Sequence, residues 1–313
     1  MITATMTSRA EVLQYLEPFL RNNLGSFLKS VEGSWQPADF LPDSRLDSFF
    51  DEVKQLRERA KELSYDLLAV LIGDTITEEA LPNYEAWFHQ LDDLGRDPNN
   101  GWAQWIRGWT AEENRHGDLL NRYLYLCGRV NMREFEVSTQ YLIADGFDLG
   151  TAHDPYRAFV YTSYQETATN LSHRRVGTLA RKAGDETRHA RVYKTFVEKI
   201  FEVDPSEMML AFEDMMRKKI VMPAHYMREL GVEMGKTFGH FTDAAQRLGV
   251  YTSHDYTDIL DTLISEWKID QITGLNGAAE KAREYIMALP NRLRRVADRM
   301  PVPKLEYKFK WIE

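Results

Sequence analysis

The sequence predicts an all-α protein, built as a bundle of helices in a single domain that spans residues 1–313. Hydrophobic residues recur with the helical period through most of the chain, and stretches that alternate as a strand would are absent. A chain of 313 residues with 43% hydrophobic residues is long enough to bury a large core. The breaks between helical stretches are too short to be flexible linkers between domains.

The helical stretches follow one another in a regular order. Residues 51–61 are charged and amphipathic, and residues 63–71 are apolar on more than one face, as in a buried helix. Comparable patterns cover residues 102–125, 155–171, 179–201, 205–222 and 256–289, with breaks at 35–43, 97–101, 145–154 and 249–254. We expect residues 1–48 to form an irregular segment with a short helix that wraps over the bundle, and residues 290–313 to form a C-terminal tail.

Composition excludes several classes of protein and of site. A net charge of −9 argues against nucleic acid as the main partner, because phosphate binding needs a positive field. The single cysteine, Cys127, cannot form an internal disulfide or a Cys-built metal site, and fits a reducing compartment. Neither an apolar run of the ~20 residues needed to cross a bilayer nor a signal-peptide core is present. We therefore expect a soluble cytoplasmic protein without membrane insertion, in which Glu, Asp and His hold any metal.

One sequence unit occurs twice. Residues 111–117 read AEENRHG and residues 184–190 read GDETRHA, so the pattern acid-Glu-x-Arg-His recurs within two helical stretches. Positions i and i+3 lie on the same face of a helix, so Glu113 with His116, and Glu186 with His189, can each point at one metal ion. A single Glu-x-x-His pair is usually part of a solvated face, whereas two copies with matching flanks indicate a dinuclear metal site.

Two further glutamates complete a ligand set for such a site. Ferritin-like carboxylate bundles hold two metals with a Glu-x-x-His pair on each of two helices and one Glu on each of two others. Glu78 and Glu166 each precede a Glu-x-x-His pair by one helical hairpin, and Glu79 is the alternative to Glu78. The second hairpin is short, so its turn is predicted at residues 173–178, with Gly177 well placed for it. Four other histidines lack metal-ligand spacing and are expected to be structural or surface residues: His173, His225, His240 and His254.

The chemistry of the predicted ligands narrows the choice of metal ion. Structural zinc prefers Cys and His, whereas four carboxylates with two imidazoles suit iron or manganese. Iron is the better choice if the site carries out oxygen chemistry. We therefore expect two iron ions per chain.

Five segments closely resemble the soluble acyl-acyl-carrier-protein desaturases. They are residues 35–43 (WQPADFLPD), 73–84 (GDTITEEALPNY), 109–126 (WTAEENRHGDLLNRYLYL), 214–225 (DMMRKKIVMPAH) and 244–252 (AAQRLGVYT), and the resemblance extends over residues 35–267. It implies a ferritin-like, usually homodimeric bundle with a di-iron site. Such enzymes use O2 and electrons from ferredoxin to place a cis double bond in a saturated acyl chain on an acyl carrier protein. In a plant, the location would be the plastid stroma.

The resemblance also assigns roles to individual residues. It prefers Glu78 to Glu79, and it implies the metal ligands Glu78, Glu113, His116, Glu166, Glu186 and His189. Thr169, three residues after Glu166, would point into the same cavity as a catalytic hydroxyl, unless it is a core threonine. Asp185 would bind the free nitrogen of His116 and link it to Trp35 as an electron path, although Trp35 is almost as well explained by packing. Arg115 and Arg188 are expected to neutralise acids such as Glu112 and Asp185.

Substrate and partner surfaces follow from the same resemblance. The acyl tunnel would be lined by Trp87, Leu91, Ala158 and Phe159. Trp87 and Ala158 are bulkier than the family leads us to expect, which suggests a substrate no longer than the usual eighteen carbons. The acidic carrier protein is expected to bind Arg217, Lys218 and Lys219, and basic clusters at 174–175 and 292–295 are alternatives.

The chain also departs from the family pattern. Residues 172–185 form a shorter connection than family members commonly have, and Thr167 stands where the family usually carries Arg. Two other functions therefore remain open. A ferritin-like oxidase or hydroxylase would use the same six ligands on another apolar substrate, and a non-catalytic bundle that binds the carrier protein would have incomplete ligation.

Overall fold

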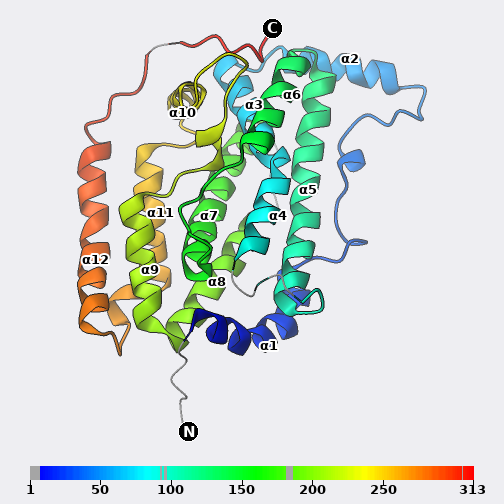
Figure 1. The fold of residues 1–313 in the computed structure, drawn as a ribbon. Helices are drawn as coiled ribbons and strands as arrows, with labels where there is room; N and C mark the ends of the chain where they lie inside the picture. The colour runs from blue at the N-terminus through cyan, green and yellow to red at the C-terminus, as the bar shows by residue number, and fades with distance from the viewer. Residues whose placement is uncertain (1–7, 92–93, 95–96, 181–185, 305) are drawn as a thin grey trace.

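Four long helices stand side by side at the centre of the computed structural model: α3 (Tyr65–Glu79), α5 (Gly101–Cys127), α7 (Pro155–Ala180) and α8 (Glu186–Val203) (Figure 1). The structure describes residues 8–91, 94, 97–180, 186–304 and 306–313, without the side chains of residues 179, 180 and 186. Among the central helices, α3 packs on α5 and α7 packs on α8. Two antiparallel pairs thus form the four-helix arrangement that the sequence predicts.

The other helices cover this core. Helix α1 crosses one end of the bundle against α5 and α8, while α9, α11 and α12 form a further layer beside α7 and α8 (Figure 1). Their bounds are α1 (Arg9–Phe27), α2 (Phe49–Ala60), α4 (Leu81–Gln90), α6 (Met132–Asp145), α9 (Pro205–Lys218), α10 (Lys236–Leu248), α11 (Ser253–Glu266) and α12 (Gly277–Ala297), with 3-10 turns at Pro37–Asp39, Pro223–Tyr226 and Ile269–Gln271. Within the described residues, β pairing is confined to an isolated bridge between Val130 and Ile312. The all-α, ferritin-like fold is therefore confirmed.

Helix α5 belongs to two hydrophobic clusters. Its first half contributes Trp102, Trp105 and Trp109 to a cluster shared with α1, α4, α7 and α8. Its second half contributes Leu124 and Cys127 to a cluster shared with α3, α6 and α10. The segment that carries the first Glu-x-x-His pair lies between these halves. Burial of apolar surface on both sides therefore fixes the helix where its polar side chains must be placed accurately.

The N-terminal helix is longer than the short helix expected within residues 1–48. Helix α1 has 19 residues and begins with a capping box, in which Ser8 Oγ accepts from Glu11 N–H and the Glu11 carboxylate accepts from Ser8 N–H. Val12, Leu16 and Leu20 recur at helical spacing and are buried. Pro37 and Pro42, which disfavour a continuous helix, lie beyond the end of α1.

The prediction of a turn at residues 173–178 is wrong. Helix α7 continues through Gly177 to Ala180, so the connection to α8 falls at residues 181–185, outside the described residues. A glycine within a helix has only a modest cost, and Val176 and Gly177 are both buried. Packing of α7 against its neighbours therefore outweighs the local turn signal.

The helical stretch predicted at residues 256–289 is two helices. Lys268 and Gly274, between α11 and α12, have φ angles of +50° and +78°, which a continuous helix cannot contain. Asn276 then caps α12 by accepting from the N–H groups of Ala278 and Ala279. Helix α12 also passes the expected boundary at residue 290 and ends at Ala297. None of the described helices combines the length and the apolar character needed to cross a membrane.

The end of the C-terminal tail is part of the core. Trp311 is fully buried, stacks on Phe309 with ring centroids 4.8 Å apart, and donates from its indole nitrogen to Ser138 Oγ over 2.8 Å. Asn131 N–H also donates to the Trp311 carbonyl over 2.7 Å. The tail is therefore tied to helix α6 and to its N-cap residue.

Trp311→Ala should lower the free energy of unfolding by about 3 kcal/mol or more, because it removes a buried indole and leaves a cavity. Chemical denaturation followed by circular dichroism measures this change. Val302→Ala is the control, since Val302 is 62% exposed in the same tail. Equal stability of the two variants would show that the tail does not contribute to the core.

Candidate metal centre

Five of the six predicted ligands come together between the four central helices. Glu78 of α3 joins Glu113 and His116 of α5 in one group, and Glu113 joins Glu166 of α7 and His189 of α8 in a second. In each group one potential ligand atom from every residue lies within 4.8 Å of the others. Glu166 and His189 are 2% and 0% exposed, so the second group is sealed from solvent.

Glu113 belongs to both groups. Its Oε2 atom lies 3.0 Å from His116 Nδ1, and its Oε1 atom lies 2.5 Å from His189 Nδ1. The two oxygens of one carboxylate thus face the imidazoles of two different helices. A carboxylate in this position can bridge two metal ions.

Glu112 holds His189 from the opposite side of the imidazole ring. Glu112 Oε2 lies 2.6 Å from His189 Nε2, while its Oε1 accepts from Lys29 N–H over 2.7 Å and Arg188 forms an ion pair with it. Burial acts to raise the pKa of Glu112, but the hydrogen bonds from His189, Lys29 and Arg188 lower it to about 2. The ionised carboxylate therefore keeps His189 Nδ1 directed at Glu113, an arrangement common to metal-bound histidines.

The charges at the centre fit a pair of divalent cations. Burial favours neutral His189, but the neighbouring carboxylates of Glu113 and Glu112 raise the pKa of His189 well above its usual value. A proton on His189 Nδ1 would lie between the imidazole of His189 and the carboxylate of Glu113, where a metal ion could lie instead. Carboxylates with imidazoles in a buried site suit iron or manganese. The donor set therefore fits the metals that the sequence predicts.

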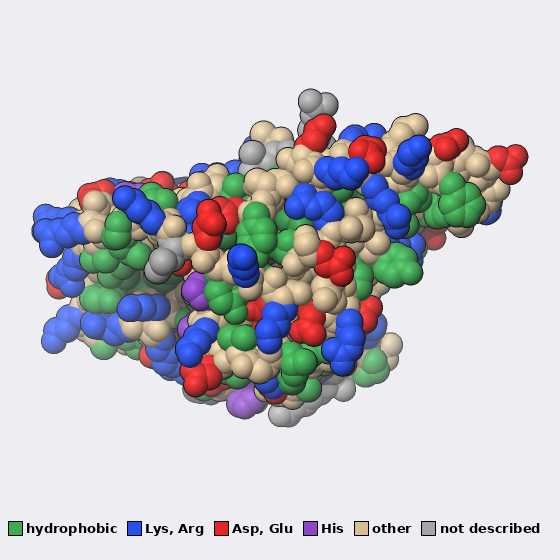
Figure 2. Space-filling view, turned by 90° about the horizontal axis from the view of Figure 1, so that it is seen from above, with side chains coloured by type: hydrophobic (Ala, Val, Ile, Leu, Met, Phe, Trp, Pro, Cys, Tyr) green, Lys and Arg blue, Asp and Glu red, His purple; other side chains and the backbone are tan. Residues whose placement is uncertain are grey.

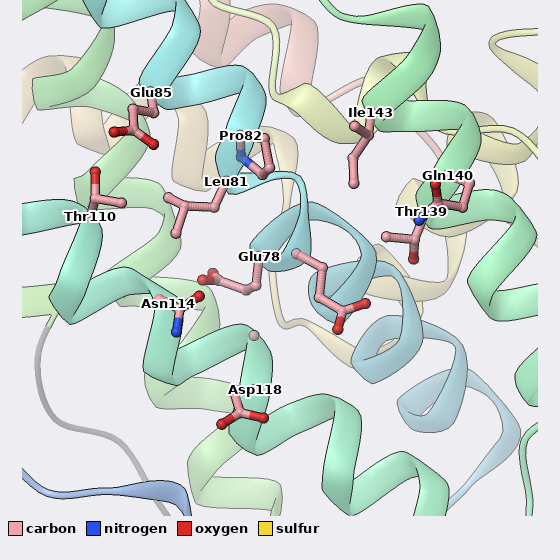
Figure 3. Close-up of a pocket in the computed structure, with 12 residues that line it drawn as sticks. Glu78, Leu81, Pro82, Glu85, Thr110, Asn114, Asp118, Thr139, Gln140 and Ile143 are labelled. Carbon is pink, nitrogen blue, oxygen red and sulfur yellow. The ribbon is translucent and has the colours of Figure 1, made fainter.

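Glu78, rather than Glu79, reaches the first group. Glu78 Oε2 lies 3.8 Å from His116 Nδ1, whereas the Glu79 carboxylate accepts from Asn121 Nδ2 over 2.5 Å. A hollow of about 570 Å³ lies beside Glu78, and its lining comes from α3, α4, α5 and α6. Figure 3 shows the Glu78 side chain extending from α3 toward Asn114 of α5.

Two predicted residues cannot be placed in the site. Glu186 is the first residue of α8, but its side chain lies outside what the structure describes. Asp185 lies wholly outside the described residues. Their predicted roles as a metal ligand and as a partner of His116 stay predictions.

Thr169 lies at a small cavity beside the metal ligands. The cavity has a volume of about 20 Å³, and Thr77, Tyr84, Trp109, Glu113 and Glu166 also line it. Gln165 Nε2 donates to Thr169 Oγ1 over 3.0 Å. The hydroxyl hydrogen of Thr169 is therefore not needed for that bond and can be donated to another acceptor.

Trp35 stacks on the outer face of the site. Its ring centroid lies 5.8 Å from that of His116, with an angle of 10° between the planes, and Trp35 is half-buried. Arg115 donates to the Trp35 carbonyl over 2.8 Å and also lies over the indole ring. Arg188 forms an ion pair with Glu112 of α5, one of the acids expected to be neutralised, whereas a pairing of Arg188 with Asp185 lies outside the described residues. Both arginines also contact a segment outside their own helix.

The sequence reasoning missed three contacts. Glu112 binds His189 of another helix, although the repeated acid before each ligand Glu was a visible signal. His173 Nε2 lies 3.5 Å from Glu78 Oε1, and its position seven residues after Glu166 places it on the same face of α7. Trp109 Nε1 donates to Glu166 Oε1 over 3.2 Å, a contact for which the sequence carried no signal.

The four predicted tunnel residues are buried in the first hydrophobic cluster. Trp87 donates to Thr151 Oγ1 over 2.9 Å and packs against Tyr161, and Phe159 stacks on Trp102. Leu91 and Ala158 are 2% and 0% exposed. None of the four residues lines the cavity at Thr169, so their place in a tunnel stays a prediction.

The predicted carrier-protein patch is partly neutralised within its own helix. Arg217 pairs with Glu213 over 2.6 Å, and Lys218 pairs with Asp214 over 2.8 Å. Figure 2 shows basic and acidic side chains interspersed over the face seen from above, with basic side chains gathered at its left end, where α12 lies. The patch at Arg217, Lys218 and Lys219 therefore stays a prediction.

The fold and the site together define a ferritin-like helical bundle with a buried cluster of carboxylates and histidines that could hold metal ions. Comparison with known proteins then identifies the family. A family model described as fatty acid desaturase matches residues 8–313. The chain belongs to this family, within the acyl-acyl-carrier-protein desaturases, and is an oxidoreductase.

Named relatives agree with this assignment. A stearoyl-[acyl-carrier-protein] 9-desaturase 5 of Oryza sativa subsp. japonica is 49% identical over 311 residues, which cover 93% of this chain and 78% of the relative. An acyl-[acyl-carrier-protein] desaturase of Cucumis sativus is 49% identical, and a stearoyl-[acyl-carrier-protein] 9-desaturase 1 of Arabidopsis thaliana is 48% identical. Each of these two covers 93% of this chain and 77% of the relative, and all three are named as chloroplastic.

Glu112→Gln should weaken metal binding by about 10–100-fold, because the neutral amide no longer holds the His189 imidazole as the carboxylate does. Titration of the apo protein with Fe²⁺ under anaerobic conditions measures this loss. Glu85→Gln is the matched control, since Glu85 lines the hollow outside both ligand groups. Equal affinities of the two variants would contradict the role of Glu112.

Proposed function

We propose that this protein places a cis double bond in a saturated acyl chain carried by an acyl carrier protein, using O2 and electrons from a reduced ferredoxin. The observation that carries the proposal is Glu113, whose carboxylate faces both His116 and His189 in a chain of the desaturase family. The relatives named as acyl-carrier-protein desaturases support the substrate class.

Two iron ions per chain are the proposed cofactor. Glu78, Glu113 and His116 would hold one ion, and Glu113, Glu166 and His189 the other, with Glu186 as the sixth ligand. When bound, the iron pair supplies activation of O2 for removal of hydrogen from an unactivated methylene. The protein provides a buried, water-poor site, in which Trp109 orients Glu166 and Glu112 orients His189.

Thr169 is the proposed proton donor at the oxygen-binding side. Its hydroxyl lies at the cavity beside Glu166 and accepts from Gln165, which leaves its hydrogen available.

Trp35 is the proposed entry point for electrons. Its half-buried ring stacks on His116, so it joins the surface to the first ligand group. Because Glu112 of α5 binds His189 of α8, the repeated unit supports the reverse contact, from Asp185 to His116. We also propose that the protein forms a homodimer and receives electrons from ferredoxin. Its proposed location is the cytoplasm or the plastid stroma.

An assay with a carrier-bound acyl chain, ferredoxin, its reductase and O2 tests the proposed reaction directly. We expect the iron-loaded protein to yield an alkene two hydrogens lighter than the substrate by mass spectrometry. A hydroxylated acyl chain would instead support the alternative of a di-iron hydroxylase. A protein that takes up no iron on reconstitution would support a non-catalytic bundle that binds the carrier protein.

Chain-length preference tests the predicted tunnel. We expect acyl chains of fourteen or sixteen carbons to be turned over faster than eighteen, because Trp87 is bulky and fixed by its bond to Thr151. Trp87→Met should shift the preference toward the longer chain. A clear preference of the parent protein for eighteen carbons would contradict this prediction.

Trp35→Phe should slow ferredoxin-supported turnover several-fold while metal content stays the same, because phenylalanine stacks but is harder to oxidise or reduce. Phe40→Leu is the control, since the Phe40 ring packs against Trp35 with ring centroids 5.5 Å apart and Phe40 is 41% exposed. Reduction of the iron by dithionite should be equally fast in both variants. Unchanged ferredoxin-supported turnover in Trp35→Phe would leave Trp35 as a packing residue.

A further inference from the structure

We propose that Gly117 is a positioning residue for Glu78. By carrying no side chain, Gly117 lets helix α3 approach helix α5 closely enough for the Glu78 carboxylate to reach the first metal position. The inference rests on the proposed dinuclear site, and it concerns one of the two positions only.

The contact at Gly117 is between helix backbones. A Cβ atom at Gly117 would lie 3.2 Å from the carbonyl carbon of Glu78 and 3.3 Å from its oxygen. It would also lie 3.3 Å from Glu79 Cγ. These distances are shorter than ordinary van der Waals contact, and the atoms of Glu78 belong to a helical backbone instead of a flexible side chain. An alanine at this position therefore requires α3 or α5 to move by a few tenths of an ångström.

Helix α3 has little room to retreat from α5. On its other side, a Cβ atom at Gly73 would lie 2.3 Å from Phe241 Cε2, so the ring of Phe241 in α10 lies directly on the α3 backbone. Gly73 precedes Glu78 and Glu79 by five and six residues, which at about 100° per residue places it on roughly the opposite side of α3. Helix α3 is thus held between α5 and α10 by a glycine contact on each side.

The site depends on the spacing that these contacts set. Glu78 lies in the last turn of α3, and its Oε2 atom is 3.8 Å from His116 Nδ1, where His116 directly precedes Gly117. Ligand distances in metal sites hold to within about 0.2 Å, so a shift of a few tenths of an ångström is large for this group. The group of Glu113, Glu166 and His189 contains no α3 residue and should be unaffected.

Of the two copies of the repeated unit, only the first has a glycine directly after its histidine. In the second copy, His189 is followed by Ala190, which is 3% exposed. A Cβ atom is therefore accommodated at the equivalent place on α8. The two halves of the site share a ligand pattern but differ in how closely their helices approach.

Anaerobic titration of the apo protein with Fe²⁺, with metal counted per chain, tests the inference. Gly117→Ala should bind one ion under conditions in which the parent binds two. Gly108→Ala is the matched control: it makes the same change in the same helix, but its Cβ would meet the Leu28 side chain, which can rotate away. This control should bind two ions.

A comparison with Glu78→Gln separates positioning from general stability. If Gly117 acts through Glu78, Gly117→Ala and Glu78→Gln should each lose one ion, and the double variant should lose no more than either. Two ions in a folded Gly117→Ala protein would overturn the inference. If the parent protein itself binds no pair of ions, the proposed function fails instead.

A second variant keeps the test decisive if Gly117→Ala does not fold. Adding Phe241→Ala opens space behind α3, so the helix can move outward and the protein should fold with one ion bound. Two ions in that double variant would also overturn the inference.

Discussion

The structure depends on how four helices bury carboxylates and imidazoles at one point. Glu113 and Glu166 are nearly sealed from solvent beside the fully buried His189. Buried carboxylates repel one another unless positive charge lies between them, and in this site that charge comes from protons on histidine or from metal ions. The four-helix core, its capping helices and its aromatic packing all serve to hold this costly arrangement in place.

Several elements far from the centre are connected to it by hydrogen bonds. The segment after α1 contributes Lys29 N–H to Glu112, which holds His189. The irregular segment that follows contributes Trp35, which is held by Arg115 and stacks on His116. The N-terminal region therefore belongs to the site as well as to the covering of the bundle.

The sequence predicted the parts of the site that depend on spacing along one helix. Glu113 with His116 follows from the i, i+3 rule, and the spacing to a preceding helix indicated Glu166 and either Glu78 or Glu79. The family resemblance then favoured Glu78. Contacts between different helices could not be predicted from spacing along one helix, because Glu112 reaches His189 only once α5 and α8 are packed together. The prediction of a turn at residues 173–178 was wrong for the same reason, because packing against neighbouring helices lets α7 continue through Gly177.

The most direct test of the central claim is the magnetic behaviour of the oxidised, iron-loaded protein. If the Glu113 carboxylate lies between two ions, Mössbauer spectra in an applied field should show two ferric ions per chain with antiferromagnetically coupled spins. Magnetically independent ferric ions in the fully loaded protein would contradict a shared site.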